Sequence, residues 1–159
     1  MSCLSSDTEF EVTTNVAEQE NVDISNGTVV WVDNRNGNQD IFGYDVTTGT
    51  EFPISTGSYF ENHPRISGDL VVWYDGRNGD GDIYGYDLST GEDFPIRVHP
   101  ESQNWPDVGR EFVVWRDYRD LESTGMDIYG SYVPEPSALA MLATAALGLP
   151  ACGWRRRRT

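Results

Sequence analysis

The chain has 159 residues, of which 26 are acidic and 11 are arginine, so its net charge at neutral pH is −15. Four of the arginines end the chain, which leaves residues 1–132 with seven arginines and no lysine against 25 acidic residues. Because binding to phosphate groups needs clustered positive charge, this composition excludes a nucleic-acid-binding protein. Two cysteines, Cys3 and Cys152, are too few for a disulfide framework.

The first six residues have neither the basic region nor the apolar core of a signal peptide. An exported protein should begin with such a segment, so this start predicts a fragment, a misassigned first residue or a degenerate gene. Residues 8–12 follow with the sequence TEFEV, which resembles TEFPI at residues 50–54. Because residues 50–54 are expected to end a repeat, we predict that residues 8–12 are the last strand of a preceding one.

A repeat fills the chain between residues 29 and 130. Each of its three segments begins with Val-Val-Trp, and the tryptophans, Trp31, Trp73 and Trp115, are 42 residues apart. An aspartate follows two residues after each tryptophan, and the sequence Asp-Ile-aromatic-Gly ends each segment. A period of this length with short strands is typical of β-propeller blades.

Four strands are expected in each repeat, separated by Asn-Gly and Thr-Gly turn signals. In the second repeat they are an outer strand and three that follow it, at residues 64–67, 70–75, 82–87 and 93–97. Residues 70–74 are apolar on both faces, which is typical of a strand covered on each side by a neighbouring blade. The sequence therefore predicts an all-β fold of propeller blades, with no helix before the C-terminal tail.

Residues 8–132 carry twelve predicted strands, or about three blades, whereas natural rings have about four to eight. We therefore expect an incomplete ring. Two chains could close a six-bladed ring as a homodimer, with residues 8–12 of one chain completing the last blade of the other. The alternative is that further blades upstream complete the ring within one longer chain.

The repeated pattern Val-Val-Trp-x-Asp, followed by Asp-Ile-Tyr-x-Tyr-Asp, resembles the TolB-type propeller repeats of bacterial surface proteins. The resemblance covers residues 8–132 and implies that the domain 1–132 is a propeller. It implies little about activity, because propellers host many unrelated functions.

Charged residues recur beside one loop of every repeat: Asp33, Asp75 and Asp117, then Arg35, Arg77 and Arg119, then Asp40, Asp82 and Asp127. One interpretation is architectural, with aspartate and arginine paired within the loop. The other is a calcium site, because Ca²⁺ takes about six to eight oxygen ligands. The residues that would offer those oxygens are Asp33, Asn36, Asn38 and Asp40 in the first loop and Asp75, Asn78, Asp80 and Asp82 in the second. The third loop lacks this pattern and should bind calcium worst.

The repeated tryptophans lie within Val-Val-Trp strands, so we expect them in the core rather than at a sugar-binding surface. Trp105 stands apart, beside Pro106, where the other repeats have His63 and Val22. It is the candidate for stacking on a ligand such as a polysaccharide. No nucleophile-elbow, phosphate-loop or zinc-binding pattern is present, so no catalytic residue is assigned.

Residues 133–159 differ in kind from the repeats. Pro134, Glu135 and Pro136 precede an uncharged apolar run at 138–154, and the chain then ends with Arg155, Arg156, Arg157, Arg158 and a threonine. As a helix, the run would reach about 25 Å, near the lower limit for crossing a bilayer. The positive-inside bias would keep the arginines in the cytoplasm and place the body across the membrane.

This order of Pro-Glu-Pro, hydrophobic segment and basic end resembles the PEP-CTERM sorting signal of Gram-negative bacteria. The resemblance implies that an exosortase recognises the tail and removes it, and that the cargo is associated with the cell surface or with exopolysaccharide. A non-specific tail anchor is the alternative.

These features indicate a non-catalytic, exported binding or scaffold protein of the cell envelope. One rival is a polysaccharide lyase or hydrolase built on a propeller, which would need catalytic residues confined to one blade. Another is a degenerate fragment of a larger surface propeller.

Overall fold

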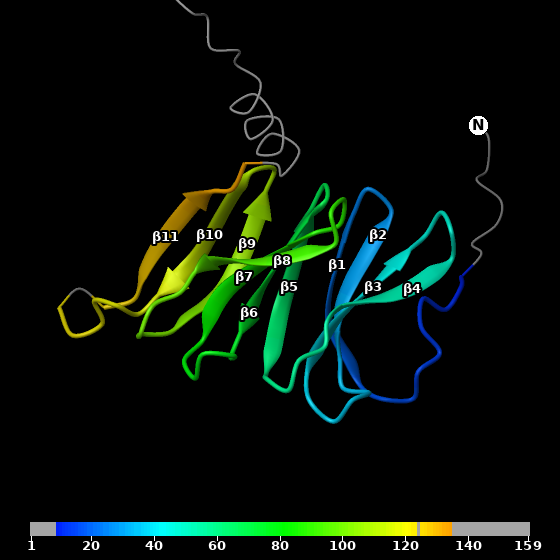
Figure 1. Cartoon of the computed structure of the whole chain (residues 1–159), viewed down its shortest axis with the longest axis horizontal. Helices are drawn as coiled ribbons and strands as arrows, with labels where there is room; N and C mark the ends of the chain where they lie inside the picture. Colours follow the sequence, from blue (N-terminus) through cyan, green and yellow to red (C-terminus); the bar gives the residue numbers. More distant parts are fainter. Residues whose placement is uncertain (1–8, 124, 135–159) are drawn as a thin grey trace, which may run out of the picture.

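The computed structural model describes residues 9–123 and 125–134, and every regular element in these ranges is a β-strand. Eleven strands form three antiparallel sheets that follow one another along the chain (Figure 1). Blade 1 contains β1 (Gln19–Ser25), β2 (Thr28–Asp33), β3 (Asp40–Asp45) and β4 (Thr50–Ser55). Blade 2 contains β5 (Glu61–Ser67), β6 (Leu70–Asp75), β7 (Asp82–Asp87) and β8 (Glu92–Arg97). Blade 3 contains β9 (Gln103–Gly109), β10 (Phe112–Asp117) and β11 (Asp127–Tyr132). The predicted all-β fold of propeller blades is confirmed.

Glycines set the tight hairpins between neighbouring strands. Asn26 and Gly27, between β1 and β2, both have positive φ, at 49° and 83°. This is the backbone of a two-residue turn whose twist matches that of the strands it joins. Gly37 and Gly79, at φ of 93° and 99°, hold the same place in the β2–β3 and β6–β7 loops. The turns therefore recur with the repeat and give blades 1 and 2 the same register.

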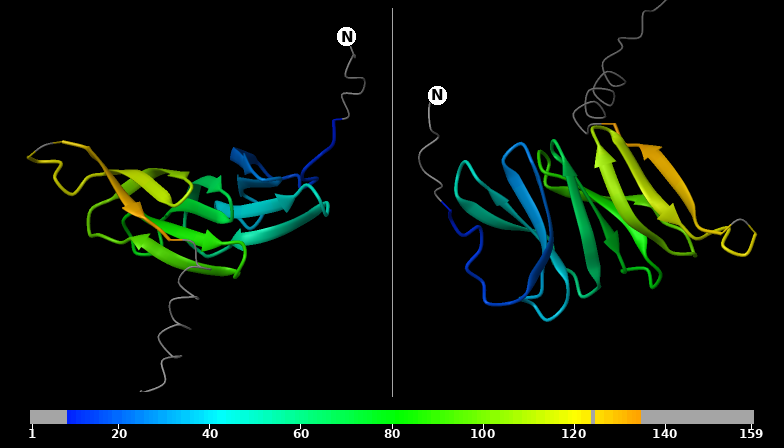
Figure 2. Two further views of the ribbon diagram at one scale, coloured as in Figure 1. Left: turned by 90° about the horizontal axis from the view of Figure 1, so that it is seen from above. Right: turned by 180° about the vertical axis from the view of Figure 1, so that it is seen from behind.

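The first strand of each blade is its innermost strand. β5 contacts both β1 and β9, so the three first strands lie together where the blades converge (Figures 1 and 2). The expectation that residues 64–67 form an outer strand is therefore wrong. Turn signals and periodicity define the order of strands within a sheet, but they do not say which edge of the sheet faces the neighbouring blades.

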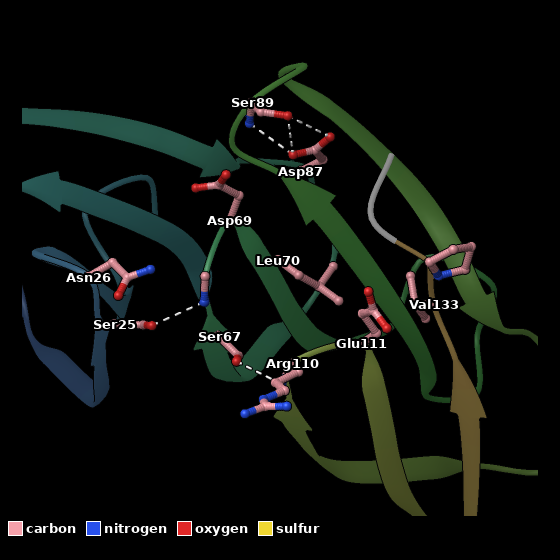
Figure 3. A pocket seen from close by; sticks show the side chains of 12 residues that line it. Ser25, Asn26, Ser67, Asp69, Leu70, Asp87, Ser89, Arg110, Glu111 and Val133 are labelled. Carbon is pink, nitrogen blue, oxygen red and sulfur yellow. Dashed lines mark hydrogen bonds between the residues drawn. The ribbon is translucent and has the colours of Figure 1, made fainter. Parts of the chain in front are cut away.

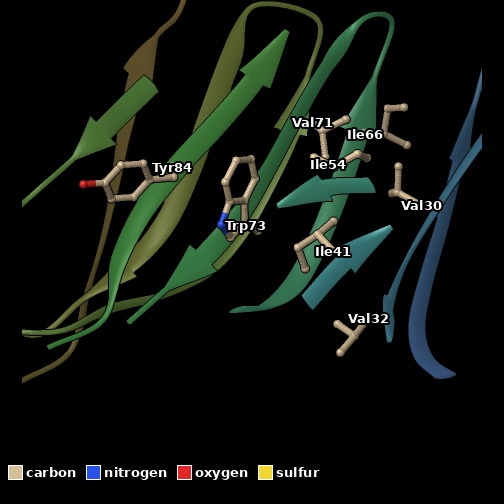
Figure 4. Close-up of a cluster of buried hydrophobic side chains, with 8 residues drawn as sticks. All are labelled: Val30, Val32, Ile41, Ile54, Ile66, Val71, Trp73 and Tyr84. Carbon is tan, nitrogen blue, oxygen red and sulfur yellow. The ribbon is translucent and has the colours of Figure 1, made fainter. Parts of the chain in front are cut away.

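Blade 2 is buried on both faces, as the apolar sequence of β6 predicted. The side chains between blades 1 and 2 are Val30, Val32, Ile41, Ile54, Ile66, Val71, Trp73 and Tyr84 (Figure 4). Those between blades 2 and 3 are Leu70, Val72, Ile83, Val113 and Trp115. The three repeated tryptophans are at most 4% exposed, which confirms that they belong to the core.

The N-terminal segment departs from the predicted strand. Residues 9–12 form no strand, so the described ranges hold eleven strands rather than twelve. Val12 nevertheless packs against Val29, Trp31 and Phe42 on the outer face of blade 1. A strand needs a hydrogen-bonded neighbour, and within the described ranges no third strand of a preceding blade stands beside this segment.

Most of the tail lies outside the described residues. These include Glu135, Pro136, the run at 138–154 and the terminal arginines, so the structure does not report on the predicted helix. In the part that the structure describes, no helix is long and apolar enough to cross a membrane.

Candidate functional site

A tryptophan, an aspartate and an arginine form the same buried cluster in every blade. The indole Nε1 donates to the aspartate two residues later, at 3.1 Å in blade 1, 2.9 Å in blade 2 and 3.0 Å in blade 3. The arginine two residues beyond forms a salt bridge with that carboxylate, at 2.6 Å for Arg35 with Asp33 and 2.7 Å for Arg77 with Asp75. Arg119 and Asp117 form the third pair.

Each guanidinium also covers an aromatic ring of the third strand. The distance from the guanidinium carbon to the ring centroid is 4.0 Å for Arg35 over Phe42 and 4.0 Å for Arg77 over Tyr84. It is 3.9 Å for Arg119 over Tyr129. Such cation–π contacts strengthen when the pair is removed from water. The pairing of aspartate and arginine within the loop is therefore confirmed.

The carboxylates of Asp33 and Asp117 are held in the charged form. Burial alone would raise the pKa of Asp33, but hydrogen bonds from Arg35 and Trp31 outweigh it and lower the pKa to about 2. The same causes lower the pKa of Asp117. Asp33 and Asp117 each accept hydrogen bonds from an indole, a guanidinium and a backbone amide. These contacts agree with the architectural interpretation of the clusters.

The second repeated aspartate organises the loop before the third strand. Asn36 and Asn38 donate to the two carboxylate oxygens of Asp40, at 2.6 and 2.8 Å. In blade 2, Asn78 donates to Asp82 at 2.7 Å, and the other oxygen of Asp82 accepts from the backbone N–H of His99 at 3.0 Å. In both loops, therefore, N–H groups of asparagine side chains or of the backbone donate to the carboxylate of the second aspartate.

The predicted calcium ligands are thus only partly brought together. Asp33 and Asp75 bond to Arg35 and Arg77, whereas Asp40 and Asp82 bond to the asparagines. Among the described residues, no three histidine, cysteine, aspartate or glutamate side chains form a group that could hold a metal ion. Calcium binding by these loops stays a prediction.

Calorimetric titration with calcium tests that prediction. Binding by the first two loops should give a dissociation constant of about 10⁻⁴–10⁻³ M and a rise in the melting temperature. Replacing Asp40 with asparagine should abolish the signal of the first loop, because it removes the carboxylate nearest to both asparagines. Asp120→Asn, in the third loop, is the matched control. An absence of heat and of any thermal shift would contradict the prediction.

A bulge residue in the first strand gives each blade one irregular position. Asn21, His63 and Trp105 all have positive φ, at 53°, 53° and 52°. Non-glycine residues seldom adopt this conformation, and they concentrate at functional sites. The structure shows that Asn21, rather than Val22, is the counterpart of Trp105 in blade 1. The signal that could have found this position is the proline that follows it in blades 2 and 3.

Trp105 sits on the surface within an aromatic and basic cluster. Its ring is 4.0 Å from that of His63, centroid to centroid, and 5.2 Å from the guanidinium carbon of Arg116. The side chain is 49% exposed, so part of the indole remains open to a ligand. Burial lowers the pKa of His63, and the charge of Arg65 lowers it further. The neutral imidazole leaves this surface suited to stacking.

Glu61 is a buried acid that the sequence analysis missed. It begins β5, where blades 1 and 3 have Gln19 and Gln103, and it is 1% exposed. Ser55 donates to one carboxylate oxygen at 2.8 Å, while the other has no hydrogen-bond partner in the structure. Burial raises the pKa of Glu61 to about 7. An acid in a place that otherwise takes glutamine is the signal that could have revealed it.

A polar pocket of about 550 Å³ lies among the turns that join the first and second strands of the three blades (Figure 3). It gathers hairpin turns from three blades, and serines link them. Ser25 Oγ accepts from the backbone N–H of Gly68 at 3.1 Å, and Ser67 Oγ accepts from that of Arg110 at 2.9 Å. Pro134, the first residue of the predicted sorting signal, also lines this pocket.

No protein-family model matches the chain, and no curated protein matches its sequence. Solved structures do match. A TolB-type protein from Agrobacterium tumefaciens superposes with a TM-score of 0.61 at 16% identity, over 76% of this chain and 47% of that one. TolB from Acinetobacter baumannii superposes with a TM-score of 0.62 at 18% identity, over 77% of this chain and 32% of that one. The chain therefore has the fold of the TolB-type β-propellers and spans less than half the length of either protein.

Proposed function

We propose that this chain is a non-catalytic binding or scaffold protein, exported to the cell envelope or exopolysaccharide of a Gram-negative bacterium and sorted by its C-terminal tail. The Pro-Glu-Pro motif carries the proposal. It begins directly after the last strand, β11, which ends at Tyr132. The N–H of Val133 still donates to the carbonyl of Glu111 at 2.7 Å, so the folded body continues up to the motif.

The side chains of the blades support a binding role over catalysis. The first aspartate of each repeat bonds to an arginine and an indole, and these contacts give it a structural role. Trp105, at the bulge position where the other blades have Asn21 and His63, is half-exposed and lies beside His63 and Arg116. An exposed indole with polar neighbours is suited to stacking on a sugar ring. A polysaccharide is therefore the ligand class that we assign to this surface.

The sorting role predicts two steps. The run at 138–154 holds the protein in the membrane, with the body outside the cytoplasm, until an exosortase removes the tail. In a host that has an exosortase, the intact mass of protein recovered from the envelope should lack the residues beyond about Pro136. The matched control is the same chain with Pro134 and Pro136 replaced by alanine, which should keep its full mass. Wild-type protein that retains its arginine-rich end would contradict the proposal.

A further inference from the structure

Blade 3 exposes the apolar face that blades 1 and 2 bury. The side chains on this face are 61% exposed at Phe112, 42% at Val114 and 69% at Ile128. Their counterparts in blade 2, Leu70, Val72 and Ile83, are 9%, 0% and 0% exposed because blade 3 covers them. An apolar face of this size on a repeat is normally the contact surface for the next repeat.

Within residues 9–123 and 125–134, blade 3 has three strands, whereas blades 1 and 2 have four. In those blades the fourth strand places an aromatic side chain over a glycine of the third strand. A Cβ atom at Gly43 would lie 2.7 Å from the Phe52 ring, and one at Gly85 would lie 3.1 Å from the Phe94 ring. The equivalent Gly130 in β11 meets only atoms of Val113 and Val114. Among the described residues, no strand pairs with the outer edge of β11.

The N-terminal segment has both the sequence and the position of such a fourth strand. Val12 packs on Val29, Trp31 and Phe42. Ile54, at the matching place in β4, packs with the matching residues of the next blade, Val71, Trp73 and Tyr84. Residues 9–12 therefore lie against blade 1 as the last strand of a preceding blade would. Among the described residues, no blade pairs with this segment and no fourth strand pairs with blade 3.

We propose that a second copy of this chain supplies the missing partner at each end. Residues 9–12 of one copy pair with β11 of the other, and the Trp31 face of blade 1 covers the open face of blade 3. The contact is mutual, so two copies form two identical interfaces and close a ring of six blades.

The register and charge of the two edges also fit. In blade 1, Gly43 lies opposite Phe52 and Tyr44 opposite Glu51. The same register places Phe10 of one copy opposite Gly130 of the other, and Glu9 opposite Ser131. The fourth strands of blades 1 and 2 also place an acid beside the loop arginine, because Glu51 forms a salt bridge with Arg35 and Asp93 with Arg77. Glu9 is the counterpart of Glu51, so the same register brings it to Arg119 of the other copy.

Disulfide trapping between two full-length variants tests this pairing, in a background with both native cysteines replaced by serine. One chain carries Glu9→Cys and the other Ser131→Cys. The N-terminal segment and β11 lie at opposite ends of a single copy (Figures 1 and 2). After mild oxidation, the mixture should give a covalent dimer at least ten times more abundant than either variant alone gives. Glu9→Cys mixed with Thr47→Cys, an exposed turn position, is the matched control.

A second variant separates loss of contact from loss of fold. Ile128→Asp alters a side chain that is already exposed in one copy, so it should keep the fold while reducing trapping at least tenfold. Val46→Asp, at an exposed position in the β3–β4 turn, should leave trapping unchanged. Trapping no greater than in the Thr47 control, or equally strong trapping with Ile128→Asp, would overturn the proposal.

Discussion

Replacing Asp75 with alanine should lower the free energy of unfolding by about 1–3 kcal/mol. The substitution leaves the buried indole N–H of Trp73 without an acceptor and removes the buried partner of Arg77. It does so in the middle blade, which is covered on both sides. A buried donor without an acceptor costs far more than the loss of an exposed ion pair, because the donor gets no hydrogen bond from water in return.

Urea denaturation measures this loss. The matched control is a substitution of Asp93, the second acid that Arg77 contacts. The guanidinium also bonds to Asp93, at 2.8 Å, and that carboxylate is 48% exposed. Asp93→Ala should therefore change the free energy of unfolding by less than about 1 kcal/mol. Equal effects of the two substitutions would show that the buried cluster does not stabilise the blade.

Replacing Glu61 with glutamine should stabilise the protein at pH 8 and leave its stability almost unchanged at pH 4. Burial raises the pKa of Glu61 from the ordinary 4.5 to about 7. Between these values the unfolded chain loses the proton while the folded chain keeps it, so the free energy of unfolding falls as the pH rises. Glutamine carries no such proton, and the gain reaches about 3 kcal/mol above pH 7.

Blades 1 and 3 indicate that glutamine fits this position. Gln19 donates to the carbonyl of Ala17, and Gln103 to that of Glu101. The carbonyl of Tyr59 holds the corresponding place in blade 2. Urea denaturation of both proteins at pH 4 and pH 8 gives the difference directly. A stability difference that is the same at both pH values would contradict a raised pKa for Glu61.

The strand pattern of this fold could be predicted because each blade repeats its own signals. The spacing of Trp31, Trp73 and Trp115 defines the period, and turn residues separate the strands. Each tryptophan also brings an aspartate and an arginine at fixed offsets, which is why the pairing within the loop could be expected. These are local relations, and backbone geometry determines them within a few residues.

The contacts of particular residues with neighbouring blades could not be predicted from the sequence. Glu61 looks like any other acid of an acidic chain until β5 is placed between two blades, where burial raises its pKa. Asn21 has no sequence likeness to His63 or Trp105, although all three share one backbone conformation. The pocket likewise depends on turns from three blades. Residues 9–12 have the sequence of a strand, but no strand of the described ranges pairs with them.

Sedimentation equilibrium of the full-length chain, in a detergent matched to the density of the solvent, tests the central claim most directly. The claim is that the two open ends of this three-blade unit are complementary and bury each other. One chain has a mass of 17.8 kDa. We predict a species of twice that protein mass at micromolar concentration, and a shift to the single mass with Ile128→Asp. A folded, cooperative species of single mass for the unmodified chain would contradict the account.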